Sequence, residues 1–180
     1  MPEMVQFVLK SYPYVKKLHF EHVTSTDNDK TFYDAFINSF IEAQRIGREN
    51  GIDVYCSGSR GIAKIKYSFC RGEFCLTPTG EIVACHRVSS KEDKAFGLYK
   101  YAEVKNGSVL IDSSKKKSVE EYFYGNHSEC KTCFAKWHCA GSCPTERSVY
   151  SDEMMELKCY FTKGLTKALL VEQLNRHVSI

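Results

Sequence analysis

The chain has 180 residues, of which 43% are hydrophobic and 13% aromatic, a composition that indicates a folded globule and excludes a disordered chain. It contains no apolar run long enough to cross a bilayer and no secretory signal peptide at its start, so we expect a cytoplasmic protein without a membrane partner. The net charge of +3 comes from scattered basic residues, and their only run, Lys115–Lys117, is typical of a solvated turn, so no nucleic-acid partner is expected.

Residues 1–57 predict an alternation of helices and strands. The expected elements are, in chain order, the end of a helix over Met4–Ser11, a strand over Val15–Val23, a helix over Lys30–Asn50 and a strand over Ile52–Tyr55. This alternation is typical of an α/β barrel or sheet, but the segment is too short to close a barrel.

The helix over Lys30–Asn50 has the clearest local signals. Asp29 is a good N-cap, and Gly51 stands where a helix usually ends. Phe32, Phe36 and Phe40 recur at four-residue intervals, so they share one face of the helix. We expect this aromatic face to pack into a core.

Residues 58–180 predict short β-hairpins followed by helices. The expected elements are the strands Phe74–Thr77 and Glu81–Cys85 around Pro78-Thr79-Gly80, the strands Tyr99–Lys105 and Val109–Ile111 around Asn106-Gly107, a short helix over Ser118–Tyr124, and a helix from Asp152 to about His177. We therefore predict an α+β fold. A small cysteine-rich domain with β-hairpins and a C-terminal helix, over residues 58–180, follows an α/β segment over residues 1–57.

The chain contains nine cysteines, which is many for its size. In a cytosolic protein metal ligation is the stronger explanation, whereas a secreted protein would use them for disulfides. The odd total indicates that one cysteine stands outside the set. Cys56, at the end of a predicted strand, is expected to be a buried core thiol.

The spacing of the other cysteines bears on the kind of site they form. A four-cysteine zinc site commonly takes its ligands from two Cys-x2-Cys pairs, and this chain has one such pair, Cys130 and Cys133. The wider gaps suit a larger inorganic centre whose ligands come from several directions. Spacing alone leaves zinc and disulfides open.

The cysteine spacing resembles that of the SPASM domain. The matching pattern is Cys70-x9-Gly80-x4-Cys85, then Cys130-x2-Cys133-x5-Cys139-x3-Cys143, then Cys159. That domain is the auxiliary iron–sulfur extension of radical S-adenosylmethionine (SAM) enzymes that mature peptides, and of the anaerobic sulfatase-maturating enzymes. The resemblance covers about residues 70–160. It implies two auxiliary 4Fe-4S clusters around which the hairpins and the C-terminal helix are folded.

The resemblance also implies how the ligands divide between the two clusters. The first set is Cys70, Cys75, Cys85 and Cys143. The second set is Cys130, Cys133, Cys139 and Cys159. The alternative for Cys75 is a buried thiol beside a cluster that keeps one open iron.

A radical SAM enzyme holds its catalytic cluster with a Cys-x3-Cys-x2-Cys motif. This sequence lacks the motif: Cys139 and Cys143 have the first spacing, but Glu146 occupies the position of the third cysteine. Residues 1–57 are therefore expected to be the C-terminal portion of a radical SAM barrel, and SAM to bind only in a complete enzyme. The implied function is redox support for the modification of a peptide or protein substrate, with an electron donor or acceptor such as a flavodoxin or ferredoxin as partner.

His86 is the candidate catalytic residue. It directly follows Cys85, where the sulfatase-maturating enzymes carry an aspartate that acts as base. A histidine suits proton transfer near neutral pH, so it could serve there, although the departure points to another substrate. The alternative is a histidine that is hydrogen-bonded near the cluster and takes no part in catalysis.

Two other functions compete with this one. A zinc-binding structural or interaction module would use the same cysteines for single ions. A disulfide-rich domain is disfavoured because no signal sequence is seen.

Overall fold

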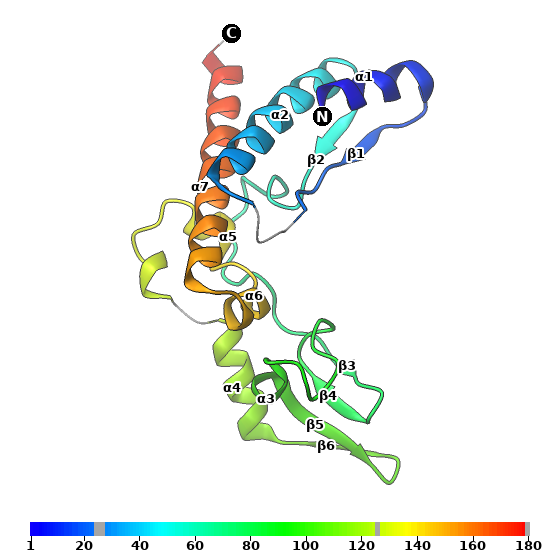
Figure 1. The fold of residues 1–180 in the computed structure, drawn as a ribbon, viewed down its shortest axis with the longest axis vertical. Coiled ribbons are helices and arrows are strands. Elements are labelled where there is room, and N and C mark those ends of the chain that lie inside the picture. The colour runs from blue at the N-terminus through cyan, green and yellow to red at the C-terminus, as the bar shows by residue number, and fades with distance from the viewer. Residues whose placement is uncertain (24–27, 125–126, 179–180) are drawn as a thin grey trace. The chain divides into compact units, whose positions relative to one another are not determined.

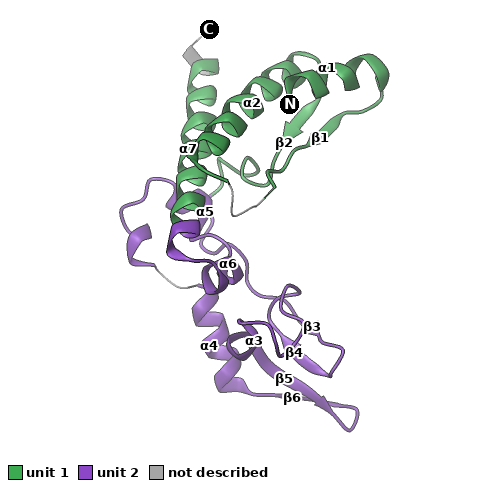
Figure 2. Cartoon of the chain, viewed as in Figure 1, with its two compact units in different colours: residues 1–64, 156–180 green, residues 65–155 purple. Residues whose placement is uncertain are grey.

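The computed structural model describes residues 1–23, 28–124 and 127–178 (Figure 1). Its chain forms two compact units, shown in Figure 2. Unit 1 contains residues 1–64 and 156–180, and unit 2 contains residues 65–155. The expected domain boundary between residues 57 and 58 stays a prediction. The division into compact units places most of the C-terminal helix in unit 1.

Unit 1 is a small α/β assembly. Its elements are α1 (Pro2–Ser11), β1 (Lys17–His19), α2 (Lys30–Glu49), β2 (Asp53–Tyr55) and the larger part of α7 (Asp152–Val178). The strands β1 and β2 pair in parallel through three residues each, from Lys17 opposite Asp53 to His19 opposite Tyr55. The predicted order of elements is confirmed, but the strand over Val15–Val23 is shorter than expected because β2 offers only three residues to pair with.

Helix α2 begins and ends where the sequence indicated. The Asp29 side chain accepts a hydrogen bond from the backbone N–H of Phe32 at 2.8 Å, and Gly51 follows the helix with φ +71°. Phe36 and Phe40 stack with ring centroids 6.0 Å apart, whereas Phe32 lies at the surface, outside this stack. The buried residues of α2 form one core with Phe161, Leu165 and Leu169 of α7.

Unit 2 is built on a four-stranded antiparallel sheet with the order β3-β4-β5-β6. Its strands are β3 (Cys75–Leu76), β4 (Glu81–Val83), β5 (Lys100–Lys105) and β6 (Ser108–Ile111). Its helices are α3 (Phe96–Tyr99), α4 (Ser113–Phe123), the 3-10 helix η1 (Ser128–Cys130), α5 (Lys136–Cys139) and α6 (Pro144–Val149). Both predicted hairpins and the α+β class are confirmed, and Asn106 and Gly107 both adopt positive φ as their turn requires.

The prediction of a turn at Lys115–Lys117 is wrong, because these lysines lie within α4. This helix starts five residues before the predicted Ser118, since the Asp112 carboxylate caps it by accepting from the N–H of Lys115 at 2.9 Å. Lys116 and Lys117 then face Glu120 and Glu121 one turn later, at 3.8 and 3.9 Å. Across the described residues, every helix is too short or too polar to span a membrane.

Gly47 is required where α2 packs on β2. A Cβ atom there would lie 2.5 Å from Cγ2 of Val54 and 2.8 Å from the carbonyl oxygen of Ile52. We expect Gly47→Ala to lower the free energy of unfolding by about 1–3 kcal/mol, as overpacked cores do, even though alanine is the better helix former. Urea denaturation followed by circular dichroism measures this.

Gly97→Ala is the matched control, because Gly97 also lies in a helix and a Cβ there would meet nothing within 4 Å. Its free energy of unfolding should stay level or rise. A Gly47→Ala variant as stable as the Gly97→Ala variant would contradict this packing.

Candidate metal centre

The hairpin of β3 and β4 presents two cysteines of the first set. Cys75 lies in β3 opposite Val83, and Cys85 follows β4 by two residues. The pairing continues beyond the strands, since the N–H of Glu73 donates to the carbonyl of Ala84 at 2.9 Å. Gly80 closes the turn with φ +87°, a conformation that glycine adopts without strain.

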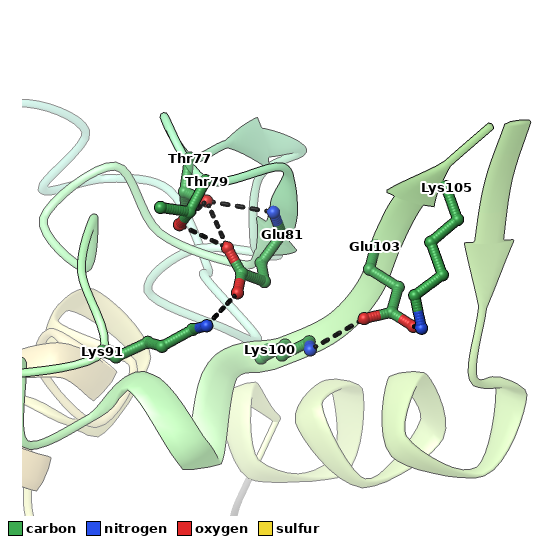
Figure 3. Close-up of polar contacts among 7 residues, drawn as sticks. All are labelled: Thr77, Thr79, Glu81, Lys91, Lys100, Glu103 and Lys105. Carbon is green, nitrogen blue, oxygen red and sulfur yellow. Dashed lines mark hydrogen bonds and ion pairs between the residues drawn. The ribbon is translucent and has the colours of Figure 1, made fainter. Parts of the chain in front are cut away.

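A buried carboxylate holds this turn in shape (Figure 3). Glu81 is only 5% exposed. Its carboxylate accepts hydrogen bonds from the hydroxyls of Thr77 and Thr79, and it forms an ion pair with Lys91 at 2.9 Å. The hydrogen bond from Thr79, followed by that from Lys91, lowers the pKa of Glu81 to about 2. The carboxylate therefore stays ionised and fixes the loop between Cys75 and Cys85.

The four thiols of the first set are neighbours in unit 2. Cys70 interacts electrostatically with Cys143 and Cys85, and Cys75 with Cys85. The structure thus brings together, from three separate segments, the cysteines that the resemblance assigns to one cluster. That they hold a cluster stays a prediction.

Burial of these thiols favours their protonated form. Burial raises the pKa of Cys70, and burial together with the Glu73 carboxylate raises the pKa of Cys75 to about 11. Cysteines bind metal as thiolates. Loading of the first set must therefore release protons.

Three cysteines of the second set lie on one looped segment of unit 2. Cys130 ends η1, Cys133 follows it in a turn with its N–H donating to the Cys130 carbonyl at 3.3 Å, and Cys139 ends α5. The fourth, Cys159, lies on α7 in unit 1. The first three cysteines thus lie on one segment of unit 2, and the fourth belongs to unit 1.

A left-handed turn separates Cys139 from Cys143. Ala140, Gly141 and Ser142 have φ values of 52°, 86° and 71°. A left-handed conformation costs a residue other than glycine about 1–2 kcal/mol, so Ala140 and Ser142 are strained. Strain of this kind persists only where surrounding contacts impose it, and it commonly marks functional sites.

The donor set suits an iron–sulfur cluster. None of the nine cysteines, all of which lie in the described ranges, is placed in a disulfide, and eight of them are half-buried. Within the described ranges, no three Cys, His, Asp or Glu side chains lie close enough to hold one metal ion. Cysteine thiolates hold both iron–sulfur clusters and zinc ions, so these donors fit either group.

His86 lies at the surface beside the first set, with its side chain 71% exposed. Its Nδ1 is 2.7 Å from Oε2 of Glu73, and its backbone N–H donates to the same oxygen at 3.1 Å. Hydrogen bonding to His86 lowers the pKa of Glu73, which is therefore an anion that orients the imidazole ring.

Cys56 lies outside the candidate site, as the sequence indicated. It is 2% exposed and belongs to the core of unit 1. Burial raises the pKa of its thiol, which keeps the side chain neutral.

The structure adds two residues that sequence reasoning missed. Thr145 donates from its hydroxyl to Sγ of Cys85 at 3.2 Å, and Arg147 donates from Nη2 to Sγ of Cys130 at 3.7 Å. Both lie on α6, directly after Cys143. No spacing signal identifies them, because each contacts a cysteine that is distant in the sequence.

Comparisons with known proteins give one structural likeness. No family model matches the chain, and no curated protein matches it. A solved structure of native anSMEcpe with bound AdoMet superposes with a TM-score of 0.60 at 17% sequence identity. The match covers 99% of this chain and 55% of that chain, so the protein described here spans about half the length of its structural neighbour. The two proteins share a fold.

The Glu81 network predicts a pH-dependent stability. Because the folded pKa, about 2, is below the ordinary value of 4.5, the carboxylate stabilises the fold above pH 4.5, and this contribution is lost as the pH falls towards 2. We expect Glu81→Gln to have a lower melting temperature than the wild type at pH 7, and the difference to close between about pH 4.5 and 2.

Thermal denaturation at a series of pH values measures this difference. The control Glu121→Gln removes a carboxylate of α4 that is 68% exposed, and it should cost little at any pH. A Glu81→Gln deficit that is the same at pH 7 and pH 2 would show that the ionised carboxylate is not what stabilises the turn.

Proposed function

We propose that this chain binds two auxiliary 4Fe-4S clusters as part of a radical SAM enzyme that modifies a peptide or protein side chain. The observation that carries the proposal is the gathering of Cys70, Cys75, Cys85 and Cys143 from separate segments into one neighbourhood. These four cysteines are not placed in disulfides, so their sulfurs are available as ligands once they are deprotonated. The shared fold with anSMEcpe supports the radical SAM context.

Each part of the site has a separate task in this proposal. The hairpin of β3 and β4 holds Cys75 and Cys85, and the Glu81 network keeps its turn rigid. The looped segment with η1 and α5 holds Cys130, Cys133 and Cys139. When bound, the clusters would supply one-electron redox chemistry, for exchange with a carrier such as a flavodoxin or ferredoxin.

His86 remains the proposed proton acceptor. The Glu73 carboxylate engages Nδ1, so the ring is oriented and Nε2 is the nitrogen left for proton transfer. The exposure of the side chain allows a substrate to reach it. The substrate is proposed to be a peptide or protein, and SAM is proposed to be bound by a complete enzyme rather than by the residues described here.

Iron content tests the proposal directly. After anaerobic reconstitution, we expect about eight irons and eight sulfides per chain, because eight cysteines fill two four-thiolate sites. Cys70→Ala and Cys130→Ala should each lose the signal of one cluster and keep that of the other. Iron and sulfide analysis, with absorption and electron paramagnetic resonance spectra, measures this.

Cys56→Ala is the matched control, because it removes a cysteine that lies outside both sets. It should keep the full iron content. Zinc in place of iron, with colourless protein, would favour the alternative of a zinc-binding structural or interaction module. Wild-type loading that stops at four irons would contradict the second cluster.

The proposal also predicts what the chain does not do. Reconstituted protein incubated with dithionite and SAM should form no 5′-deoxyadenosine, because a cluster closed by four thiolates leaves no iron for the amino and carboxyl groups of SAM. Chromatography of the products measures this, with an enzyme that contains the Cys-x3-Cys-x2-Cys motif as positive control. Formation of 5′-deoxyadenosine would show that one of the two sites keeps an open iron.

A further inference from the structure

Helix α6 carries two hydrogen-bond donors that reach both sets of cysteines. It begins directly after Cys143, with Pro144 in the first turn, where proline fits a helix. The N–H of Arg147 donates to the Cys143 carbonyl at 3.1 Å, so the first turn of the helix is tied to a cysteine of the first set. Its buried side chains are Pro144, Thr145 and Glu146.

Thr145 faces the first set. The residue is 4% exposed, and its hydroxyl donates to Sγ of Cys85 at 3.2 Å. A buried hydroxyl needs a hydrogen-bond partner, and the Thr145 side chain interacts both with the Cys85 sulfur and with the Tyr99 side chain. The contact is neutral, since threonine carries no charge.

Arg147 faces the second set with a charged group. Its side chain is 11% exposed, and its guanidinium contacts three different groups. Nε donates to the carbonyl of Gly141, Nη1 to Oε1 of Glu129 at 2.8 Å, and Nη2 to Sγ of Cys130 at 3.7 Å. Because the guanidinium is a rigid plane, the two contacts with oxygen fix the direction of the third donor toward the sulfur.

Donors to a ligand sulfur stabilise the form with more negative charge. An iron–sulfur cluster gains an electron on reduction, and hydrogen bonds to its cysteine sulfurs therefore raise its reduction potential. A hydrogen bond from a cation is stronger than one from a neutral hydroxyl. The Glu129 carboxylate offsets part of the charge of Arg147, but the N–H donor itself remains directed at Cys130.

We propose that Thr145 and Arg147 are positioning residues that raise the reduction potentials of the two clusters independently, Thr145 through Cys85 and Arg147 through Cys130. This inference rests on the proposed function, because it requires that both sets hold clusters. In this inference, one short helix, α6, sets part of the reduction potential of each cluster.

The experiment is an anaerobic redox titration of the reconstituted chain, followed by electron paramagnetic resonance. Cys70→Ala and Cys130→Ala, which each leave one cluster, identify the two midpoint potentials. Thr145→Val should make only the first-set potential more negative, and Arg147→Gln only the second-set potential, with the larger shift for Arg147→Gln. The double variant should show both shifts together.

Matched controls separate this effect from disturbance of the helix. Ser148→Ala removes a neighbouring hydroxyl of α6 that donates to the Thr145 carbonyl, and it should leave both potentials unchanged. Lys131→Gln removes the same charge as Arg147→Gln one residue after Cys130, and should shift the second-set potential less. Thr145→Ser keeps the hydroxyl and should restore the wild-type value.

The outcomes distinguish this inference from the proposed function. A wild-type chain that binds no iron overturns both. Single variants with full iron content and unchanged potentials, or single variants in which both potentials move, overturn the inference and leave the proposed function standing. If Arg147→Gln loses iron, Arg147→Lys replaces it in the titration, because lysine keeps the charge but lacks the planar group. An unchanged second-set potential in Arg147→Lys would also overturn the inference.

Discussion

The arrangement of both cysteine sets depends on the left-handed turn at Ala140–Ser142. Helix α5 ends at Cys139, and the N–H of Ala140 closes it by donating to the Lys136 carbonyl at 2.8 Å. Three successive positive φ values then redirect the chain before α6 begins after Cys143. Alanine and serine do not favour this conformation, so contacts outside the turn must hold it. Arg147 provides one of them, since its Nε donates to the carbonyl of Gly141, and the same guanidinium contacts Cys130.

Charge is the second constraint on the site. Two four-thiolate clusters with a 2+ core would add about −4, which turns the formal charge of +3 into about −1. The structure places cations beside this negative charge: Arg147 contacts Cys130, and Arg87 interacts electrostatically with Cys143. The raised pKa values of Cys70 and Cys75 favour neutral thiols, which add no negative charge to the chain.

Local signals predicted the elements that present the cysteines, but not the contacts between them. Turns and helix caps act within a few residues, so the sequence indicates where they form. Examples are the turns at Gly80 and Asn106-Gly107 and the helix cap at Asp29. Helix α4 starts earlier than predicted because the Asp112 carboxylate caps it, and an aspartate next to serines and lysines is equally typical of a turn. Other contacts join segments that are far apart in the chain, and no periodicity or spacing in the sequence indicates such contacts. Examples are the packing of α7 with residues 1–64 and the hydrogen bonds from Thr145 and Arg147 to cysteine sulfurs.

A shared fold does not establish a shared reaction, so the direction of electron flow has to be argued from the site. If both sets hold clusters that are otherwise alike, the charged donor at Cys130 would give the second set the higher potential, and the neutral donor at Cys85 would give the first set the lower one. Electrons move spontaneously from the lower to the higher potential. His86, the candidate base, directly follows Cys85 of the first set. If the first set holds a cluster, His86 would accept the proton from a substrate radical that the complete enzyme has formed by hydrogen-atom abstraction, and the cluster beside it would accept the unpaired electron.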